Sequence, residues 1–209
     1  AGKSTRMKAN KSKLLFNIAG KPVINHIISS LKEAKAKDNL CVINKNSVEI
    51  KKILDSEKVS HVYQTVLNGT AGAVKAALKK KPVSNNKLLI LCGDIPFIKS
   101  TSIKRIINKL KTYDAVVGTV EIDSPKGYGR IIRDNNKFKS IIEERETTAL
   151  QRQIKEVNTG IIAIHERVLR EFISKIKNNN QKKEYYLTDI IKILVDNNKK
   201  VTTFKFANE

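Results

Sequence analysis

The sequence predicts an α/β protein in which an open, mostly parallel β-sheet is followed by a β-rich lobe. Up to residue 122, apolar segments of strand length alternate with segments of helical periodicity, as in open sheets with right-handed crossovers. Residues 88–92 form a continuous apolar run, which is typical of a strand buried on both faces of a parallel sheet. The pattern then changes, because residues 129–146 read as a hairpin that turns at 134–136.

The expected elements follow from the spacing of apolar residues. From Val23 to Leu31 these residues recur at the spacing of one helical face, so we expect a helix over residues 22–36. Thr70–Lys80 is rich in alanine and has high helix propensity. Further helices are expected at 48–54, 102–111, 167–178 and 188–197, and strands at 40–44, 59–63, 87–92, 114–122, 157–164 and 201–206.

Length and composition indicate one globular domain. The 209 residues suffice for a large core or for two lobes, and are too few for two full-sized independent domains. Cys41 and Cys92 lie inside apolar runs, so we expect buried, reduced thiols rather than disulfides or metal ligands. No segment has the apolar length of a membrane span, and no secretory signal is recognisable. We therefore expect a cytoplasmic protein without a membrane partner.

The formal net charge of +21 is the strongest bias in the composition. Taken alone, it would favour a polyanionic partner such as nucleic acid, an anionic membrane or a phosphate-rich substrate. The lysines are spread along the chain, however, and the clusters Lys79–Lys81 and Lys182–Lys183 have no interleaved aromatic residues that would stack on bases. We interpret the clusters as solvated surface and expect no nucleic acid among the partners.

The opening segment has the composition of a phosphate-binding loop. Small residues let backbone N–H groups approach phosphate oxygens, and Lys and Arg offset phosphate charge. Taken alone, the segment also matches the tail of a Walker-type loop, whose earlier glycine would precede residue 1, or a frayed basic terminus. The residues concerned are Ala1, Gly2, Lys3, Ser4, Thr5, Arg6, Met7 and, further on, Lys13.

Asp94 follows the apolar run 88–92 directly after Gly93. The carboxyl end of a buried parallel strand is where open α/β sheets bind ligands, and a carboxylate there can hold a magnesium ion against phosphate oxygens. A turn or helix-cap aspartate is the alternative for an isolated Gly-Asp. We expect Asp94 and the opening loop, with Arg6, to converge on one triphosphate.

Seven segments carry a family resemblance along essentially the whole chain. They are residues 1–7 with Lys13, 64 with 68–71, 93–96, 127–131, 141–143, 151–161 and 184–189. Together they resemble the uridyltransferase domain of the bacterial bifunctional N-acetylglucosamine-1-phosphate uridyltransferase and glucosamine-1-phosphate N-acetyltransferase, also called UDP-N-acetylglucosamine pyrophosphorylase. The first segment is shared by many sugar and alcohol nucleotidyltransferases, whereas the last two are much more specific.

The resemblance implies a fold and residue roles. The sheet would be Rossmann-like, of the nucleotide-diphospho-sugar transferase type, in a single domain over residues 1–209. A nucleotide-binding lobe would cover about 1–122 and a sugar-binding lobe about 123–209. Asp94 would bind Mg²⁺. The resemblance assigns catalysis to Arg6 and Lys13, nucleotide binding to Ala1, Gly2, Lys3, Gln64, Gly69 and Thr70, and sugar binding to Gly129, Glu143, Asn158, Tyr186 and Thr188.

The implied reaction makes UDP-N-acetylglucosamine and pyrophosphate from UTP and N-acetylglucosamine 1-phosphate, for peptidoglycan and lipopolysaccharide precursor synthesis. A sugar-phosphate oxygen would attack the α-phosphorus in line. Because this oxygen is already anionic, positioning and charge neutralisation would suffice. Nothing in the 209 residues encodes the family's acetyltransferase β-helix, through which it trimerises. We therefore expect no acetyl transfer and leave the oligomeric state open.

Several features depart from the family pattern. Ser4 stands where glycine is usual, and Lys11–Ser12 stands where Leu-Pro is usual. The family's apolar first strand and an asparagine that is its second magnesium ligand are also missing, so we expect a fragment.

Two rival functions remain. One is a related nucleotidyltransferase, such as a cytidylyltransferase acting on a sugar-alcohol phosphate. The other is a basic nucleic-acid-binding protein, which would bind DNA or RNA with a steep salt dependence.

Overall fold

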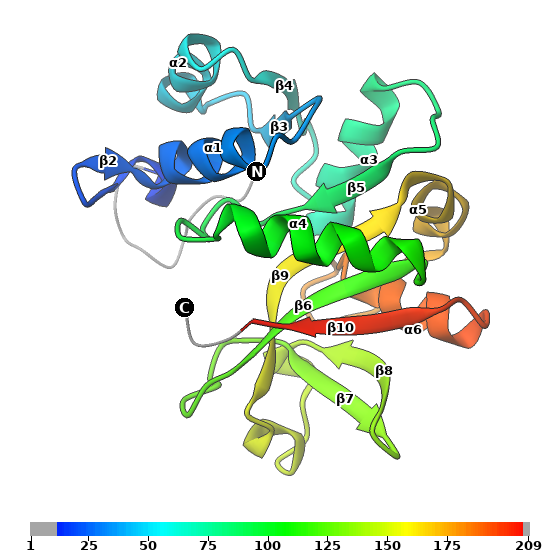
Figure 1. The fold of residues 1–209 in the computed structure, drawn as a ribbon. Coiled ribbons are helices and arrows are strands. Elements are labelled where there is room, and N and C mark those ends of the chain that lie inside the picture. Colours follow the sequence, from blue (N-terminus) through cyan, green and yellow to red (C-terminus); the bar gives the residue numbers. More distant parts are fainter. Residues whose placement is uncertain (1–11, 207–209) are drawn as a thin grey trace. The chain divides into compact units, whose positions relative to one another are not determined.

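The computed structural model describes residues 12–206 (Figure 1). Every helix and strand expected from the apolar spacing is present, with ends shifted by a few residues. The α/β class is therefore confirmed. Within this part of the chain, no helix is long and apolar enough to cross a membrane.

The chain divides into two compact units. Unit 1 contains the described residues up to Pro82 together with Cys92–Lys104, and unit 2 contains Val83–Leu91 together with the described residues from Arg105 onward. The units interleave in sequence because β5 (Lys87–Ile90) is hydrogen-bonded to a strand of unit 2. The boundary between the units does not fall at residue 122. The nucleotide-binding and sugar-binding lobes that we expect describe binding rather than compactness, and they stay a prediction.

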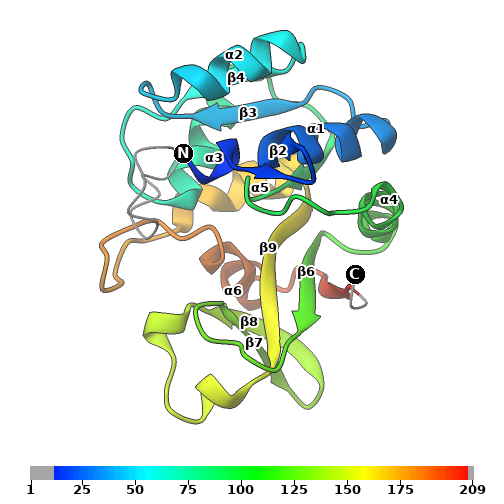
Figure 2. The ribbon, with the colours of Figure 1, turned by 90° about the vertical axis from the view of Figure 1, so that its left-hand side faces the viewer.

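Unit 1 is built on two parallel strands, β3 (Leu40–Ile43) and β4 (Ser60–Tyr63). Figure 2 shows them with α1 (Val23–Glu33), which precedes β3, α2 (Val48–Ser56), which connects the strands, and α3 (Thr70–Lys80), which follows β4. Both α2 and α3 pack against the two strands. The carboxyl ends of β3 and β4 lead into the loops before α2 and α3, where open sheets bind ligands.

Apolar side chains from one face of α1 and one face of α2 form the core of unit 1. Ile24 and Ile28 of α1 are one turn apart, as are Ile50 and Leu54 of α2, so each pair lies on one helix face. The burial of Ile24 and Ile28 confirms the helical face predicted from their spacing. The buried cluster consists of Leu15, Ile24, Ile28, Ile43, Ile50 and Leu54.

A short hairpin that the apolar spacing does not predict precedes α1. Its strands, β1 (Asn17–Ile18) and β2 (Lys21–Pro22), are two residues long each and pair antiparallel. Ala19 and Gly20 form the turn, with φ angles of 47° and 79°, as in a two-residue hairpin turn. Two-residue strands are too short to show periodicity, which explains why the pattern missed them.

Unit 2 contains a six-stranded sheet in the order β10-β6-β9-β7-β8, in which β5 also pairs with β9. Among the described strands of this sheet, β6 and β10 run parallel, whereas β9 is antiparallel to β5, β6 and β7. The sheet is thus mixed rather than mostly parallel as expected, because an apolar run reports burial and not strand direction. The strands are β5 (Lys87–Ile90), β6 (Ala115–Glu121), β7 (Arg130–Asp134), β8 (Lys137–Ile142), β9 (Glu156–His165) and β10 (Val201–Lys205).

Burial along β5 is lower than the apolar run 88–92 suggests. Residues 88–91 are half-buried and Cys92 is exposed, whereas residues 115–119 of β6 are buried. Cys92 follows the end of β5 and lies outside the sheet, so the expected burial of its thiol is wrong. Cys41 on β3 is half-buried, and burial raises the pKa of its thiol.

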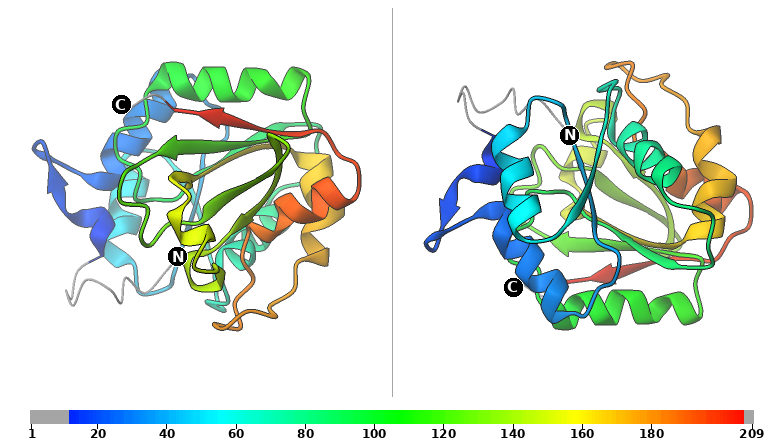
Figure 3. Two further views of the ribbon diagram at one scale, coloured as in Figure 1. Left: turned by 90° about the horizontal axis from the view of Figure 1, so that it is seen from below. Right: turned by 90° about the horizontal axis from the view of Figure 1, so that it is seen from above.

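Helices α5 (Glu166–Phe172) and α6 (Asp189–Asp196) contact each other in unit 2 (Figure 3). α5 packs against β9, and α6 packs against β8 and β10. The packing of α6 places the segment before Asp189 next to β8. A further helix, α4 (Ser100–Asn108), begins in unit 1 and ends in unit 2. Short 3₁₀ helices are η1 (Lys13–Leu15), η2 (Lys109–Lys111), η3 (Glu144–Glu146), η4 (Gln151–Gln153) and η5 (Ile173–Lys175).

Leu54→Ala should lower the free energy of unfolding by about 2–5 kcal/mol, because it leaves a cavity in the core. Leu54 is 1% exposed. Urea denaturation followed by circular dichroism measures the loss. Val48→Ala is the matched control, since Val48 begins the same helix with 58% exposure. Equal losses for the two variants would contradict this description of the core.

Candidate functional site

Lys13 and Asp94 form an ion pair within unit 1, although 81 positions separate them. Ser12 caps η1, since its Oγ accepts a hydrogen bond from the Leu14 N–H at 3.4 Å. The turn of Asp94 lies against η1, because a Cβ added at Gly93 would lie 3.1 Å from both Leu14 methyl carbons. Two of the predicted phosphate-site residues are therefore side by side.

The other residues expected around the phosphates lie outside the described part of the chain. They are Ala1, Gly2, Lys3 and Arg6, so the expected meeting of Arg6 with Asp94 stays a prediction.

The described residues suit a magnesium ion only as part of a larger ligand set. Among them, no group of three or more His, Cys, Asp or Glu side chains could hold a metal ion. The side chain of Asp94 is 44% exposed. Magnesium is commonly held by one or two carboxylates together with substrate phosphates and water. A single, partly exposed carboxylate beside the expected phosphate site fits this chemistry.

Gln64 directly follows β4 and is 6% exposed. Its backbone N–H donates to the Ile43 carbonyl at 2.8 Å, which continues the pairing of β3 with β4. Its side-chain Nε2 donates to Asn68 Oδ1 at 3.3 Å and to the Gly69 carbonyl at 3.1 Å. Because both partners are acceptors, they fix the amide orientation and leave Oε1 to accept a hydrogen bond from a ligand.

Two glycines shape the surroundings of the Gln64 side chain. Gly69 precedes Thr70, the first residue of α3, and has a φ of 110°, which side chains other than that of glycine rarely allow. Gly72 lies in the first turn of α3, where an added Cβ would overlap Asn68 Oδ1 and would lie 3.0 Å from Gln64 Nε2. The sequence does not predict a role for Gly72, because a glycine inside an alanine-rich helix indicates only a local loss of helix propensity.

In unit 2, Glu143 lies beside two of the residues expected to bind the sugar, Gly129 and Thr188, and Gly129 contacts a third, Asn158. Thr188 Oγ1 donates to Glu143 Oε1 at 2.9 Å. A Cβ added at Gly129 would lie 3.7 Å from Glu143 Oε2, so the absence of a side chain keeps this carboxylate accessible. The Asn158 N–H donates to the Gly129 carbonyl at 2.8 Å. The structure therefore brings together four predicted residues from four separate segments.

An irregularity in the pairing of β6 with β9 positions Asn158. Thr119 pairs with Asn158, whereas Val117 pairs with Ile162, so β9 bulges relative to β6. Gly160 lies in the bulge with a φ of 78°, and its N–H donates to Asn158 Oδ1 at 3.0 Å. Bulges of this kind redirect side chains near functional sites. The side-chain Nδ2 of Asn158 can donate to a ligand.

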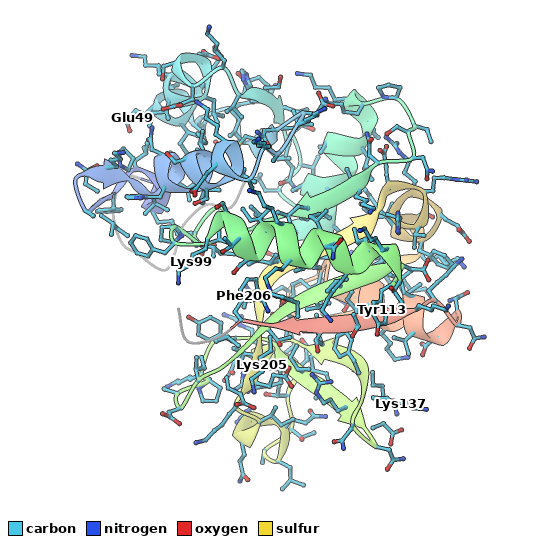
Figure 4. All side chains as sticks on the ribbon, in the orientation of Figure 1. Glu49, Lys99, Tyr113, Lys137, Lys205 and Phe206 are labelled. Carbon is cyan, nitrogen blue, oxygen red and sulfur yellow. The ribbon has the colours of Figure 1, made fainter. Side chains whose placement is uncertain are left out.

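Gly118 accommodates the same bulge from β6. An added Cβ would lie 2.7 Å from Thr159 Oγ1 and 2.6 Å from the ring of Phe206, which follows β10 (Figure 4). Thr159 Oγ1 donates to the Gly118 carbonyl at 2.8 Å. Any larger residue at this position would therefore force the Thr159 or Phe206 side chain to move.

Carboxylates dominate the electrostatics around Glu143. Burial, followed by the charges of Glu143 and Glu146, raises the pKa of Asp189 to about 6. Burial is also the main cause of the raised pKa of Tyr186, and the charges of Glu184, Glu143 and Glu146 add to it. Tyr186 is thus within the field of the same carboxylates. Asp189 lies within the motif 184–189 but has no predicted role, because a half-buried carboxylate cannot be told from a helix cap by its sequence.

Arg130 belongs to the motif 127–131 but has no predicted role. It is 1% exposed, and its Nη2 pairs with Glu144 Oε2 at 2.8 Å. The same guanidinium donates to the carbonyls of Tyr128 and, at 3.3 Å, Arg152. Its position before two apolar residues in a strand is the one sequence signal that would have suggested burial.

Comparisons with known proteins show what the chain is similar to. Residues 1–158 match the family model described as the MobA-like NTP transferase domain. The chain is 39% identical over 193 residues to the "Bifunctional protein GlmU" of Francisella tularensis subsp. novicida, covering 91% of the chain and 42% of that protein. It is 36% identical over 211 residues to that of Alkaliphilus metalliredigens, covering 100% of the chain and 46% of the relative. It therefore spans less than half the length of these relatives.

Solved structures show the same fold. A putative glucose-1-phosphate thymidylyltransferase from Bacillus anthracis, in complex with a sucrose, superposes with a TM-score of 0.79 at 21% identity, covering 99% of this chain and 84% of that one. A UDP-glucose pyrophosphorylase complexed with UDP-glucose gives a TM-score of 0.82 at 17% identity, covering 100% and 89%. The nucleotidyltransferase architecture and the resemblance found in the sequence are confirmed: the chain belongs to the family of MobA-like NTP transferase domains.

Proposed function

We propose that the chain transfers a uridylyl group from UTP to N-acetylglucosamine 1-phosphate, giving UDP-N-acetylglucosamine and pyrophosphate. The observation that supports this most is the contact of Gly129 and Thr188 with Glu143, together with the hydrogen bond from Asn158 to Gly129. These residues are far apart in sequence, and the family resemblance assigns all of them to the sugar site.

The hydrogen bonding of Gln64 supports UTP as the nucleotide. Its free acceptor, Oε1, complements the N3–H of uracil. Cytosine has an acceptor at N3, so it would place two acceptors against each other, and unpaired buried polar groups discriminate strongly. The backbone of Gly69 would read a second atom of the base, and Thr70 would help to hold the nucleotide.

The Glu143 cluster supports an amino sugar as the group bound in unit 2. Carboxylate, amide and hydroxyl groups from Glu143, Asn158 and Thr188 complement sugar hydroxyls. Glu146 and Asp189 add negative charge there. Because like charges repel, this environment disfavours the acceptor's phosphate and orients it away from Glu143.

The chemistry requires positioned charge rather than a general base. A phosphate oxygen of the acceptor forms the new bond to the α-phosphorus, and pyrophosphate leaves with the electrons of the broken P–O bond. Lys13 and Arg6 offset the charge that opposes the approach of two anions. Asp94 would hold Mg²⁺, which when bound supplies further neutralisation of phosphate charge.

The cellular setting follows from this proposal. The product would serve peptidoglycan and lipopolysaccharide synthesis, the use that the sequence resemblance implies. Cys41 and Cys92 are not joined in a disulfide in the described part of the chain, which suits a reducing compartment and supports a cytoplasmic reaction.

Pyrophosphate release with each of the four NTPs tests the substrate assignment. We expect turnover with UTP, Mg²⁺ and N-acetylglucosamine 1-phosphate, and at least about 100-fold less with CTP because of the acceptor mismatch at Gln64. Glucose 1-phosphate, which lacks the N-acetyl group, is the acceptor control. Activity with CTP and none with UTP would overturn the assignment.

Gly72→Ala should weaken UTP binding with little effect on folding. The new methyl displaces the Asn68 side chain and breaks its hydrogen bond to Gln64, which costs about 0.5–1.5 kcal/mol, or roughly 2–10-fold in affinity. Titration calorimetry measures the dissociation constant. In an Asn68→Ala background the displaced side chain is absent, so Gly72→Ala should have less effect there than in the wild type. Equal effects in the wild-type and Asn68→Ala backgrounds would contradict the proposed role of the Asn68–Gln64 hydrogen bond in UTP binding.

Asp189→Asn should change the pH dependence of stability. The folded-state pKa of about 6 lies above the ordinary 3.8, so the folded state retains a proton that the unfolded chain releases. This stabilisation is present at low pH and is lost as the pH rises through about 6. The uncharged variant should therefore gain about 1–2 kcal/mol relative to wild type between about pH 4 and pH 7.5, after allowing for partial exposure.

Denaturation across this pH range measures the difference between the two proteins. Asp196→Asn is the control, because Asp196 ends the same helix in an exposed ion pair with Lys192. A pH-independent difference for Asp189→Asn would show that the carboxyl group is not held in this environment.

A further inference from the structure

We propose that the ion pair between Arg130 and Glu144 is a positioning element that sets the spacing of Gly129 and Glu143, and with it the affinity for the acceptor sugar. This inference rests on the proposed function and adds two residues that do not themselves contact substrate. Each partner is the immediate neighbour in sequence of a residue assigned to the sugar: Arg130 follows Gly129, and Glu144 follows Glu143.

The contacts of Arg130 join two segments that have no regular pairing with each other. Its guanidinium binds Glu144 and the Arg152 carbonyl on the segment after β8, and the Tyr128 carbonyl on the segment before β7. The Gly127 N–H, also before β7, donates to Glu144. The two segments are therefore tied directly beside Gly129 and Glu143.

The protonation state of Glu144 favours this pair. Burial alone would raise the pKa of Glu144, but the Gly127 N–H and the nearby Arg130 guanidinium outweigh burial and lower it. Glu144 thus stays ionised near neutral pH and remains paired with a cation. Its charge is offset locally and adds little to the carboxylates that face the sugar.

Stability alone does not explain a buried arginine at this position. Arg130 is 1% exposed, and replacing a buried ion pair with well-packed apolar residues is often neutral or stabilising. An apolar pair would fill the volume. It would not fix the distance and angle between the segments that carry Gly129 and Glu143, as a planar guanidinium does. The geometric role is the one that requires these residue types.

The same sheet supplies a matched control. Arg133 lies three positions further along β7 and forms two hydrogen bonds to Glu156 of β9, at 2.9 and 2.8 Å. This pair also joins β7 to a neighbouring segment, but neither residue adjoins Gly129 or Glu143. A purely structural effect of losing an arginine–glutamate pair should appear at both positions.

Steady-state kinetics on Glu144→Gln and Glu156→Gln test the proposal. For Glu144→Gln we expect KM for N-acetylglucosamine 1-phosphate to rise about tenfold, with KM for UTP unchanged within about twofold, because only the acceptor site loses its spacing. Glu156→Gln should leave both constants near wild type. Arg130→Lys, which keeps the charge but loses the fork, should give an intermediate acceptor KM.

Equal rises in both KM values, or the same change in Glu156→Gln, would overturn the proposal. If Glu144→Gln fails to fold by circular dichroism, Glu144→Asp replaces it, because it keeps the charge and shortens the reach. A wild-type acceptor KM in that variant would also overturn the proposal. Failure of the proposed function is seen separately, as absence of uridylyl transfer by the wild-type protein.

Discussion

The antiparallel pairing of β9 with both β6 and β7 is the constraint on which the site in unit 2 depends. It brings the start of β9, with Asn158, beside the start of β7, where the Gly129 carbonyl accepts the Asn158 N–H. The β7–β8 hairpin then returns the chain so that Glu143, one residue beyond β8, lies beside Gly129. Backbone hydrogen bonds therefore bring these residues onto adjacent segments, within reach of the side-chain contacts that complete the site.

Local charge and net charge have opposite signs at this site. The chain carries a formal charge of +21, yet the surroundings of Glu143 are acidic. These carboxylates are compatible with folding because Thr188 donates to Glu143, Arg130 pairs with Glu144, and Asp189 binds a proton up to about pH 6. Net charge acts over distances that salt screens, whereas groups within hydrogen-bond distance decide which part of a ligand binds.

The sequence predicts those features that repeat along the chain or match a motif. Helix α1 was found because one of its faces is buried, and the proximity of Glu143 to Thr188 was implied by motifs 45 positions apart. Strand direction could not be predicted, because burial on both faces leaves the same apolar run in either orientation. The exposure of Cys92 and the pairing of Arg130 depend on which segments meet in space, and neither leaves a local pattern.

The glycines show where the site and the local fold make different demands. In the first turn of α3, alanine in place of Gly72 would favour the helix by about 0.5–1 kcal/mol. The fold alone would therefore select a side chain there, but that side chain would overlap Asn68 and crowd Gln64. A position where local propensity is sacrificed without any gain in packing is expected at a functional site. Gly72 thus supports a functional role for Gln64 and Asn68 independently of the family motif that contains Gln64.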